Sequence, residues 1–233
     1  MRTHLPACLA VLALAAPADA ATRNFGITDF TRIRVAGPYR VQLVTGVAPF
    51  ARASGSQSAL DRVAIEVRGD TLVVQPNASW GGYPGSDIGP IEVTVGTHEL
   101  NRASVVGSGA VAIDRVKGLS FALTVQGSGA GQIADVAVDQ MNISLEGTAS
   151  ARVAGKTGKL VALVRGVSAL DAAALSTPSA DIDADGTATI DAEVTDTARV
   201  NGWGPATVRL TGNPSCTLKV SGAAAVSGCR STQ

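Results

Sequence analysis

The stretch that decides the fold is Gly107-Ser108-Gly109-Ala110, which recurs twenty residues later as Gly127-Ser128-Gly129-Ala130. Gly147-Thr148-Ala149 follows after a further twenty residues. Later glycines continue the series at intervals of 19, 20, 16 and 20 residues, at Gly166, Gly186, Gly202 and Gly222. A period of this length, with a short β-like run before each glycine, predicts a solenoid of stacked coils.

Apolar residues fall into columns when the coils are aligned on these glycines. Before the glycine, the predicted columns run through Phe121, Leu123 and Val125, then Met141, Ile143 and Leu145, then Leu160, Ala162 and Val164, then Ala180, Ile182 and Ala184. The sixteen-residue coil places Ala198 and Val200 in the last two columns, which Leu218 and Val220 close. After the glycine, a second pair of columns runs through Gly131 and Ile133, then Ala151 and Val153, then Leu170. Such columns are expected where parallel strands stack about 4.8 Å apart and equivalent inward residues pack on one another.

The part of the chain before the repeat has a different pattern of apolar residues, without the regular glycine spacing. Ile33, Val35, Tyr39, Val41 and Leu43 share one parity across a turn at residues 37–38, and residues 63–67 and 72–74 flank a hairpin signal at residues 69–70. We therefore predict an all-β chain with N-terminal strands over about 25–99 and repeat coils over about 100–229, in one domain over 21–233. The alanine-rich residues 169–175 are expected to form a strand, because a proline follows closely at position 178.

Residues 1–20 match a secretory signal peptide. Arg2 and His4 form a polar start, nine apolar residues run from position 8 to 16, and Ala18-Asp19-Ala20 fits the cleavage rule. We expect cleavage near Ala20 and a periplasmic or secreted bacterial protein. In that oxidising compartment, Cys216 and Cys229 are expected to form a structural disulfide.

The charge balance excludes several classes of partner. Lys plus Arg and Asp plus Glu both total 19, so the net charge is zero, and no later segment has eighteen consecutive apolar residues. The sequence therefore carries no electrostatic signal for nucleic acid or an anionic membrane, and no membrane-spanning segment is expected.

The order of these motifs resembles the head GIN domain family of auto-transporter adhesins. The match begins at residues 30–43 (FTRIRVAGPYRVQL), continues through 70–74 (DTLVV), 91–95 (IEVTV) and Leu100, and ends in the Gly-Ser-Gly repeats, so it covers about residues 25 to 225. The resemblance implies an exported, right-handed parallel β-helix-like solenoid with about 20-residue coils, preceded by a mixed or antiparallel N-terminal part. It brings no catalytic residues with it.

Candidate chemistry is sparse. Asp181, Asp183 and Asp185 precede Gly186 and open like a calcium loop, but the twelfth position is Ala192 where a glutamate is needed. Strand alternation would place the three carboxylates on one face, either as a solvated acidic row, as a Ca²⁺ site, or as the acids of a polysaccharide-cleaving enzyme. His98, which is the one histidine beyond the signal, has no motif for a triad or a zinc site and is expected at the surface.

Aromatic residues offer a second candidate site. Only 3% of the residues are aromatic, yet Trp80 and Tyr83 share one glycine-rich loop, where their rings could stack on sugar or plug the end of the coils; Trp203 lies near another glycine-rich bend. These features favour a non-enzymatic exported solenoid that binds an extended partner such as a polysaccharide or another cell-envelope component. A lyase or glycosidase that uses the acidic row is the alternative, and self-association through open solenoid ends is a third interpretation.

Overall fold

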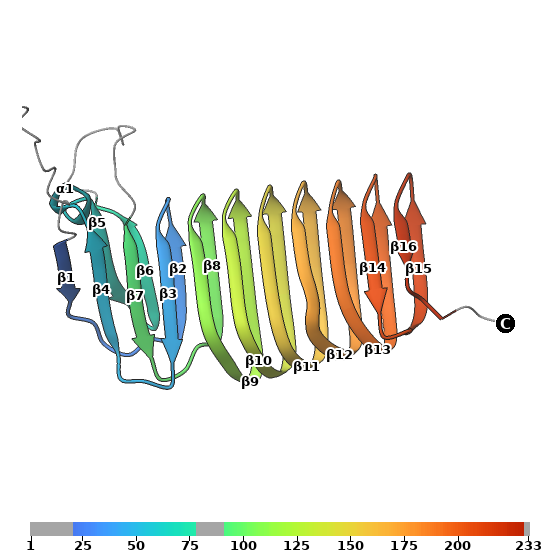
Figure 1. The fold of residues 1–233 in the computed structure, drawn as a ribbon, viewed down its shortest axis with the longest axis horizontal. Helices are drawn as coiled ribbons and strands as arrows, with labels where there is room; N and C mark the ends of the chain where they lie inside the picture. Colours follow the sequence, from blue (N-terminus) through green and yellow to red (C-terminus); the bar gives the residue numbers. More distant parts are fainter. Residues whose placement is uncertain (1–20, 78–90, 231–233) are drawn as a thin grey trace, which may run out of the picture.

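The chain winds into a β-solenoid whose coils follow one another along a single rod (Figure 1). This computed structural model describes residues 21–77 and 91–230. The predicted signal peptide and the aromatic residues Trp80 and Tyr83 lie outside that range. None of the helices in the described range is long and apolar enough to cross a membrane.

Five long strands form the middle of the rod, and each passes from one flat face of the solenoid to the other: β9 (Ala110–Gly127), β10 (Ala130–Gly147), β11 (Ser150–Gly166), β12 (Ala169–Gly186) and β13 (Thr189–Trp203). On the first face, their N-terminal halves continue a sheet that also holds β1 (Ala21–Phe25), β4 (Phe50–Gly55), β7 (Glu92–Thr97), β3 (Arg40–Thr45), β14 (Thr207–Thr211) and β16 (Ala225–Ser227). On the second face, their C-terminal halves continue β5 (Val63–Arg68), β6 (Thr71–Pro76), β2 (Arg32–Ala36) and β8 (Arg102–Gly107), and β15 (Ser215–Ser221) ends the series. The hydrophobic core lies between the two faces.

The predicted columns are confirmed through the first four coils of the repeat. Met141 pairs in register with Phe121 and Leu160, and Leu145 pairs with Val125 and Val164, all in parallel strands. The alanine-rich residues 169–175 are part of β12, as expected. Every one of these column residues is buried, so inward side chains of one coil pack directly on those of the next.

The predicted register of the sixteen-residue coil is wrong by two residues, whereas Leu218 and Val220 of the last coil lie in the last two columns, as predicted. Ala198 pairs with Ala180 and Val200 with Ile182, which places both residues one column earlier than the sequence alignment did. Gly202 is an inward strand position beside Ala184, and the corner is Gly204, whose Cβ position would lie 3.4 Å from the Cα of Gly186. With the corners at Gly186, Gly204 and Gly222, the last two coils are each eighteen residues long, and there is no sixteen-residue coil.

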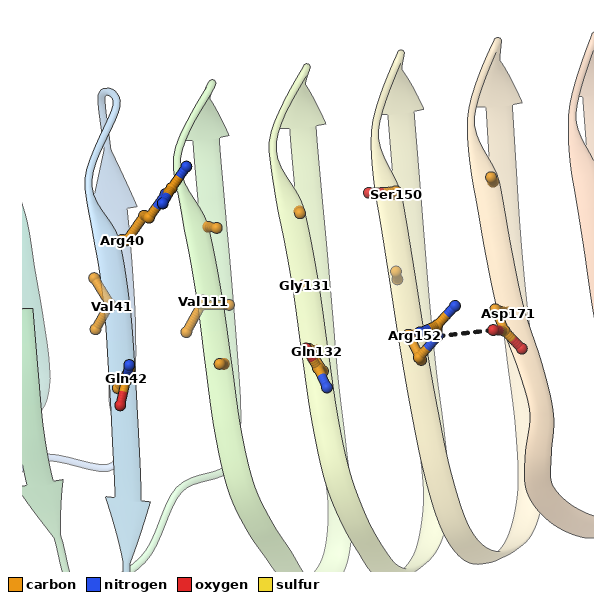
Figure 2. Close-up of a pocket in the computed structure, with 14 residues that line it drawn as sticks. Arg40, Val41, Gln42, Val111, Gly131, Gln132, Ser150, Arg152 and Asp171 are labelled. Atoms are coloured by element: carbon orange, nitrogen blue, oxygen red, sulfur yellow. Dashed lines mark hydrogen bonds and ion pairs between the residues drawn. The ribbon is translucent and has the colours of Figure 1, made fainter. Parts of the chain in front are cut away.

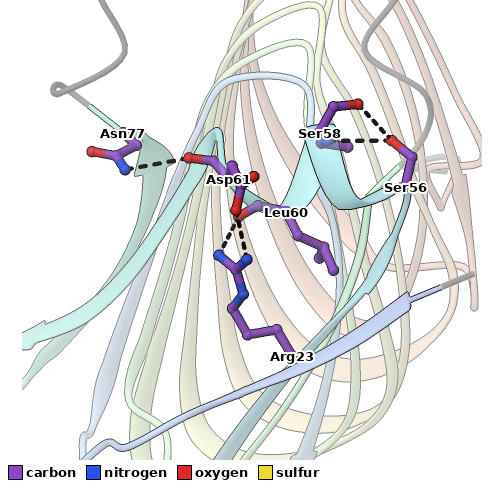
Figure 3. Close-up of polar contacts among 7 residues, drawn as sticks. Arg23, Ser56, Ser58, Leu60, Asp61 and Asn77 are labelled. Atoms are coloured by element: carbon purple, nitrogen blue, oxygen red, sulfur yellow. Dashed lines mark hydrogen bonds and ion pairs between the residues drawn. The ribbon is translucent and has the colours of Figure 1, made fainter.

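The N-terminal part mixes strand directions, as the sequence predicted. β5 and β6 form the expected two-residue hairpin, with Val67 paired to Leu72, while β2 and β3 already lie parallel to the repeat coils. β1 pairs antiparallel to β4, and a four-residue helix α1 (Gln57–Leu60), not predicted from the sequence, is capped by Ser56. Figure 3 shows Arg23 of β1 reaching the carbonyl of Leu60 (3.0 Å) and the carboxylate of Asp61 (2.6 Å), contacts that fasten the first strand to this helix.

The C-terminal end is closed by a covalent link. Cys216 and Cys229 form the predicted disulfide, with their Cα atoms 5.7 Å apart, and both side chains pack partly against the core. Leu218 and Val220 continue the inward columns but are 43% and 48% exposed, because no described strand follows β15 on this face. The disulfide thus stabilises a last coil that has a neighbour on one side only.

Candidate functional site

Parallel stacking arranges the outward side chains of the first face into straight rows. The row nearest the glycine corner consists of small residues over several coils, and the next outward row is polar. The first row runs through Arg40, Ala110, Ala130, Ser150 and Ala169, and the second through Gln42, Ala112, Gln132, Arg152 and Asp171. Since rungs of a sheet are about 4.8 Å apart, each row presents one outward side chain at regular intervals along the rod.

The short side chains of the first row leave a hollow in this face, which we call the trough. It has a volume of about 460 Å³ and runs across β3, β9, β10, β11 and β12 (Figure 2). Ala110 and Ala130 form its floor together with the backbone at Gly131, while Arg40 lies at one end. At the other end, Arg152 Nε donates to Asp171 Oδ2 over 2.8 Å, and both side chains are substantially exposed. The trough therefore offers an elongated surface with a floor of small side chains, an arginine at one end and an Arg–Asp pair at the other.

The aspartate row lies on the second face, where β11, β12 and β13 run side by side. Asp181 Oδ2 is 2.6 Å from Lys159 Nζ, and Asp183 accepts a 2.6 Å hydrogen bond from Asn201. Asp185 is exposed and pairs in register with Arg165 and Trp203. No three acidic, histidine or cysteine side chains converge on a common point anywhere in residues 21–77 and 91–230. The three carboxylates share one outward face, as alternation predicted, but each faces different neighbours.

Trp203, the remaining predicted site residue within the described range, and His98, which was expected at the surface, lie at the ends of different strands. Trp203 ends β13 with 46% of its surface exposed, in register with Asp185 and Ser221. His98 follows β7 and its Nδ1 lies 3.0 Å from Asp29 Oδ2. The side chain of His98 is 59% exposed, so the expected surface position is confirmed.

Thr97, beside that histidine, is fully buried, and its hydroxyl donates to Asp29 Oδ1 over 2.9 Å. This hydrogen bond, supported by the contact with His98, holds the pKa of Asp29 below its ordinary value of 3.8. Thr97 and His98 both contact the carboxylate and not each other. The cluster therefore connects the segment before β2 to the end of β7, and it lacks the nucleophile–base contact that a catalytic triad requires.

The trough was not predicted from the sequence. A weak signal was available, since Ala110 and Ala130 follow the repeated glycines at the same offset and Gln132 and Arg152 alternate with the inward columns. The sequence signal does not reveal that β3 contributes to the trough, because β3 lies in the N-terminal part before the repeat and its register with β9 is known only from the structure.

Comparison with known protein families gives a match. Residues 29–214 match a family model whose description is "Putative auto-transporter adhesin, head GIN domain". None of the curated proteins matches this sequence.

Three solved structures share the fold. A structure described as a putative adhesin from Bacteroides fragilis is 17% identical, with a TM-score of 0.79 over 89% of this chain and 96% of that one. One from Parabacteroides distasonis, described as a putative lipid binding protein, is 19% identical, with a TM-score of 0.70 over 90% and 96%. A putative adhesin from Parabacteroides merdae is 17% identical, with a TM-score of 0.68 over 90% and 96%. At this identity, the likeness is one of architecture.

Proposed function

Because the chain belongs to the head GIN domain family of auto-transporter adhesins, we propose that it is an exported, non-enzymatic binding protein that holds an extended polymer, such as a polysaccharide, along the trough. The single observation that carries this proposal is that the trough runs across five successive strands and so follows the rod axis. An extended ligand that lies along the rod axis can contact several successive rungs.

The chemistry of the trough suits a hydroxyl-rich chain. Gln42 and Gln132 each offer amide donors and a carbonyl acceptor, and the exposed Arg152–Asp171 pair offers both charges at one end. The alanine floor lets a flat ring approach the sheet closely. A rigid β scaffold also reduces the entropy that is lost on binding, because the contact residues are already positioned.

A non-enzymatic role is further supported by the state of the acidic row. Lyases and glycosidases of this shape need two carboxylates, or a carboxylate and a base, facing one sugar. Here Asp181 forms an ion pair with Lys159 on β11, whereas Asp183 accepts a hydrogen bond from Asn201 on β13, on the other side of β12. A turnover assay on acidic polysaccharides remains the direct check. If the wild-type chain releases product and Asp183→Asn does not, the alternative of a lyase or glycosidase that uses the acidic row would be favoured.

Filling the trough tests the proposal. In Ala130→Tyr, a large ring would occupy the floor, and binding to the polysaccharides retained by the wild-type chain on a glycan array should weaken by about tenfold or more, equivalent to 1.4 kcal/mol. The matched control is Ala122→Tyr, which adds the same side chain at a half-exposed outward position on the second face. Equal binding by the two variants would contradict the proposal.

The same glycan-array assay tests whether the loop with Trp80 and Tyr83 contributes to binding. Trp80→Ala and Tyr83→Ala are expected to weaken binding if the rings contact the polymer, because stacking on sugar needs a flat apolar face. Unchanged binding would remove the loop from the proposed function without affecting the trough.

A further inference from the structure

A second hollow lies on the opposite face, near the C-terminal end of the rod. Its volume is about 450 Å³, and most of its lining is polar. The walls come from β11, β12, β13 and β15, with Ala180 and Ala198 at the inward positions between them. We call it the hydroxyl hollow, and it contains no residue of the trough.

The strand register arranges its polar side chains as a grid. Lys159, Ser179, Thr197 and Ser215 occupy one row on four successive rungs. Two residues further along each strand, Asp181, Arg199 and Thr217 form the adjacent row. Neighbouring rungs are about 4.8 Å apart and the two rows about 6.6 Å apart. Short hydroxyl side chains thus lie between the longer Lys159 and Arg199, and this difference in length produces the hollow.

The charges of the hollow leave one cation in excess. Asp181 contacts Lys159 at 2.6 Å and Arg199 at 3.5 Å, and the side chains of Lys159 and Arg199 are 44% and 63% exposed. Such exposed ion pairs contribute little stability, so their members are free to exchange partners. Arg199 has five N–H donors, and within the part of the chain that the structure describes its ion-pair partner is Asp181.

The surrounding sequence strengthens this positive character. From Thr197 to the C-terminus the chain has four cationic residues, Arg199, Arg209, Lys219 and Arg230, and no Asp or Glu. Residues 91–196 carry thirteen acids against seven bases. The hollow lies where these two regions meet: Lys159, Ser179 and Asp181 belong to the first, and Thr197, Arg199, Ser215 and Thr217 belong to the basic one. Of the four cationic residues, Arg209 lies on the first face and is paired with Asp191. An anionic group would therefore be attracted to this end of the rod.

We propose that the hydroxyl hollow binds a uronic-acid residue of an acidic polysaccharide. The sugar carboxylate pairs with Arg199, whose planar fork matches a carboxylate, and with Lys159. The sugar hydroxyls exchange hydrogen bonds with Ser179, Thr197 and Ser215, each of which can donate and accept. This site is separate from the trough, so either one can fail without the other.

The geometry favours a sugar over an acidic peptide. An extended peptide binds best to a free sheet edge, where backbone groups are unpaired. Around Lys159 and Arg199, β12 and β13 are both paired to neighbours on each side, so only side chains are available there, and the edge of β15 that no described strand pairs with lies at the border of the hollow. A row of hydroxyls beside cations complements a ligand that carries hydroxyls and a carboxylate on one ring.

Titration calorimetry with the full chain tests this proposal, using oligogalacturonate as the probe and maltooligosaccharide of equal length as the neutral comparison, both in EDTA. Oligogalacturonate should bind and maltooligosaccharide should not. Arg199→Gln should weaken binding about tenfold, and Thr197→Val should weaken it about threefold, in line with the loss of a charged and a neutral hydrogen bond. Circular dichroism checks that the exposed substitutions leave the fold intact.

The matched control is Arg165→Gln, which removes the same charge from an exposed position of the same face, outside the hollow. It should bind like the wild type, as should Ala130→Tyr. Equal losses in Arg165→Gln and Arg199→Gln would overturn the proposal, since they would show only a general charge effect. Equally tight binding of dextran sulfate or polyglutamate would overturn it too, and so would binding that requires calcium.

Discussion

A glycine at the corner of each coil allows successive coils to stack closely. Gly147 has φ of +99°, and a Cβ atom there would lie 2.7 Å from the carbonyl oxygen of Gly127 in the preceding coil. The positive φ turns the chain from one face to the other, and the missing side chain lets the two backbones approach. Both requirements exclude any other residue without a local shift.

We therefore expect Gly147→Ala to lower the free energy of unfolding by at least 1–2 kcal/mol, roughly the cost of placing a Cβ in the left-handed region. Urea denaturation followed by circular dichroism measures the change. Gly26→Ala is the control, because no atom lies within 4 Å of its Cβ position and its φ is not in that region. Equal stability of the two variants would mean that the corner does not need glycine.

Asp29 provides a second prediction at this scale. Its folded pKa is held below 3.8, chiefly by the hydrogen bond from Thr97 and also by His98, so it adds stability that is present above pH 3.8 and is lost as the pH falls through the folded pKa. Asp29→Asn should remove this part of the acid sensitivity. Thermal unfolding at pH 7 and at pH 3 should show a smaller difference for the variant than for the wild type, and identical differences would contradict the assignment.

Among the elements, β15 and β16 depend most on a covalent link. Among the described strands, β15 pairs only with β13, and β16 is three residues long and pairs with β14. The Cys216–Cys229 disulfide joins the beginning of β15 to the segment after β16, around the exposed Leu218 and Val220. Coils at the ends of a solenoid have one neighbour and so open first.

A double variant, Cys216→Ser with Cys229→Ser, should lose about 3 kcal/mol of local stability, the chain-entropy estimate for a loop of this size. Hydrogen exchange followed by mass spectrometry should show faster exchange in β14, β15 and β16 and unchanged exchange in β10. Reduction of the wild-type chain should reproduce the pattern. Faster exchange spread evenly over all coils would contradict this local role.

Over the whole molecule, charge and shape are distributed unevenly although the net charge is zero. The acidic residues gather in the middle coils, and the last coils are purely basic. The two hollows are on opposite faces, the trough over β3 to β12 and the hydroxyl hollow over β11 to β15. A rod of this kind can present two different binding surfaces to different parts of one long partner.

The sequence predicted most of the core but not the end of the repeat. Columns such as Val125, Leu145 and Val164 were recognisable because identical spacing recurs with each glycine. The predicted register failed where Gly202, and not Gly204, was taken as the corner glycine. The two glycines are two residues apart, so both fit the alternation of inward and outward positions, and only the packing of Gly204 against Gly186 distinguishes the corner from a strand position. The antiparallel pairing of β1 with β4 also had no periodic signal.

By itself the sequence determined the solenoid, the disulfide and the surface position of His98, because each follows from local spacing or from the identity of one residue. The tertiary structure alone decided which outward side chains meet. The trough joins β3 to coils from the second half of the chain, and the hydroxyl hollow joins residues 159 to 217 across four rungs. The physical reason is that a row across a sheet depends on the register between strands, and a shift of two residues leaves the alternation of inward and outward positions unchanged.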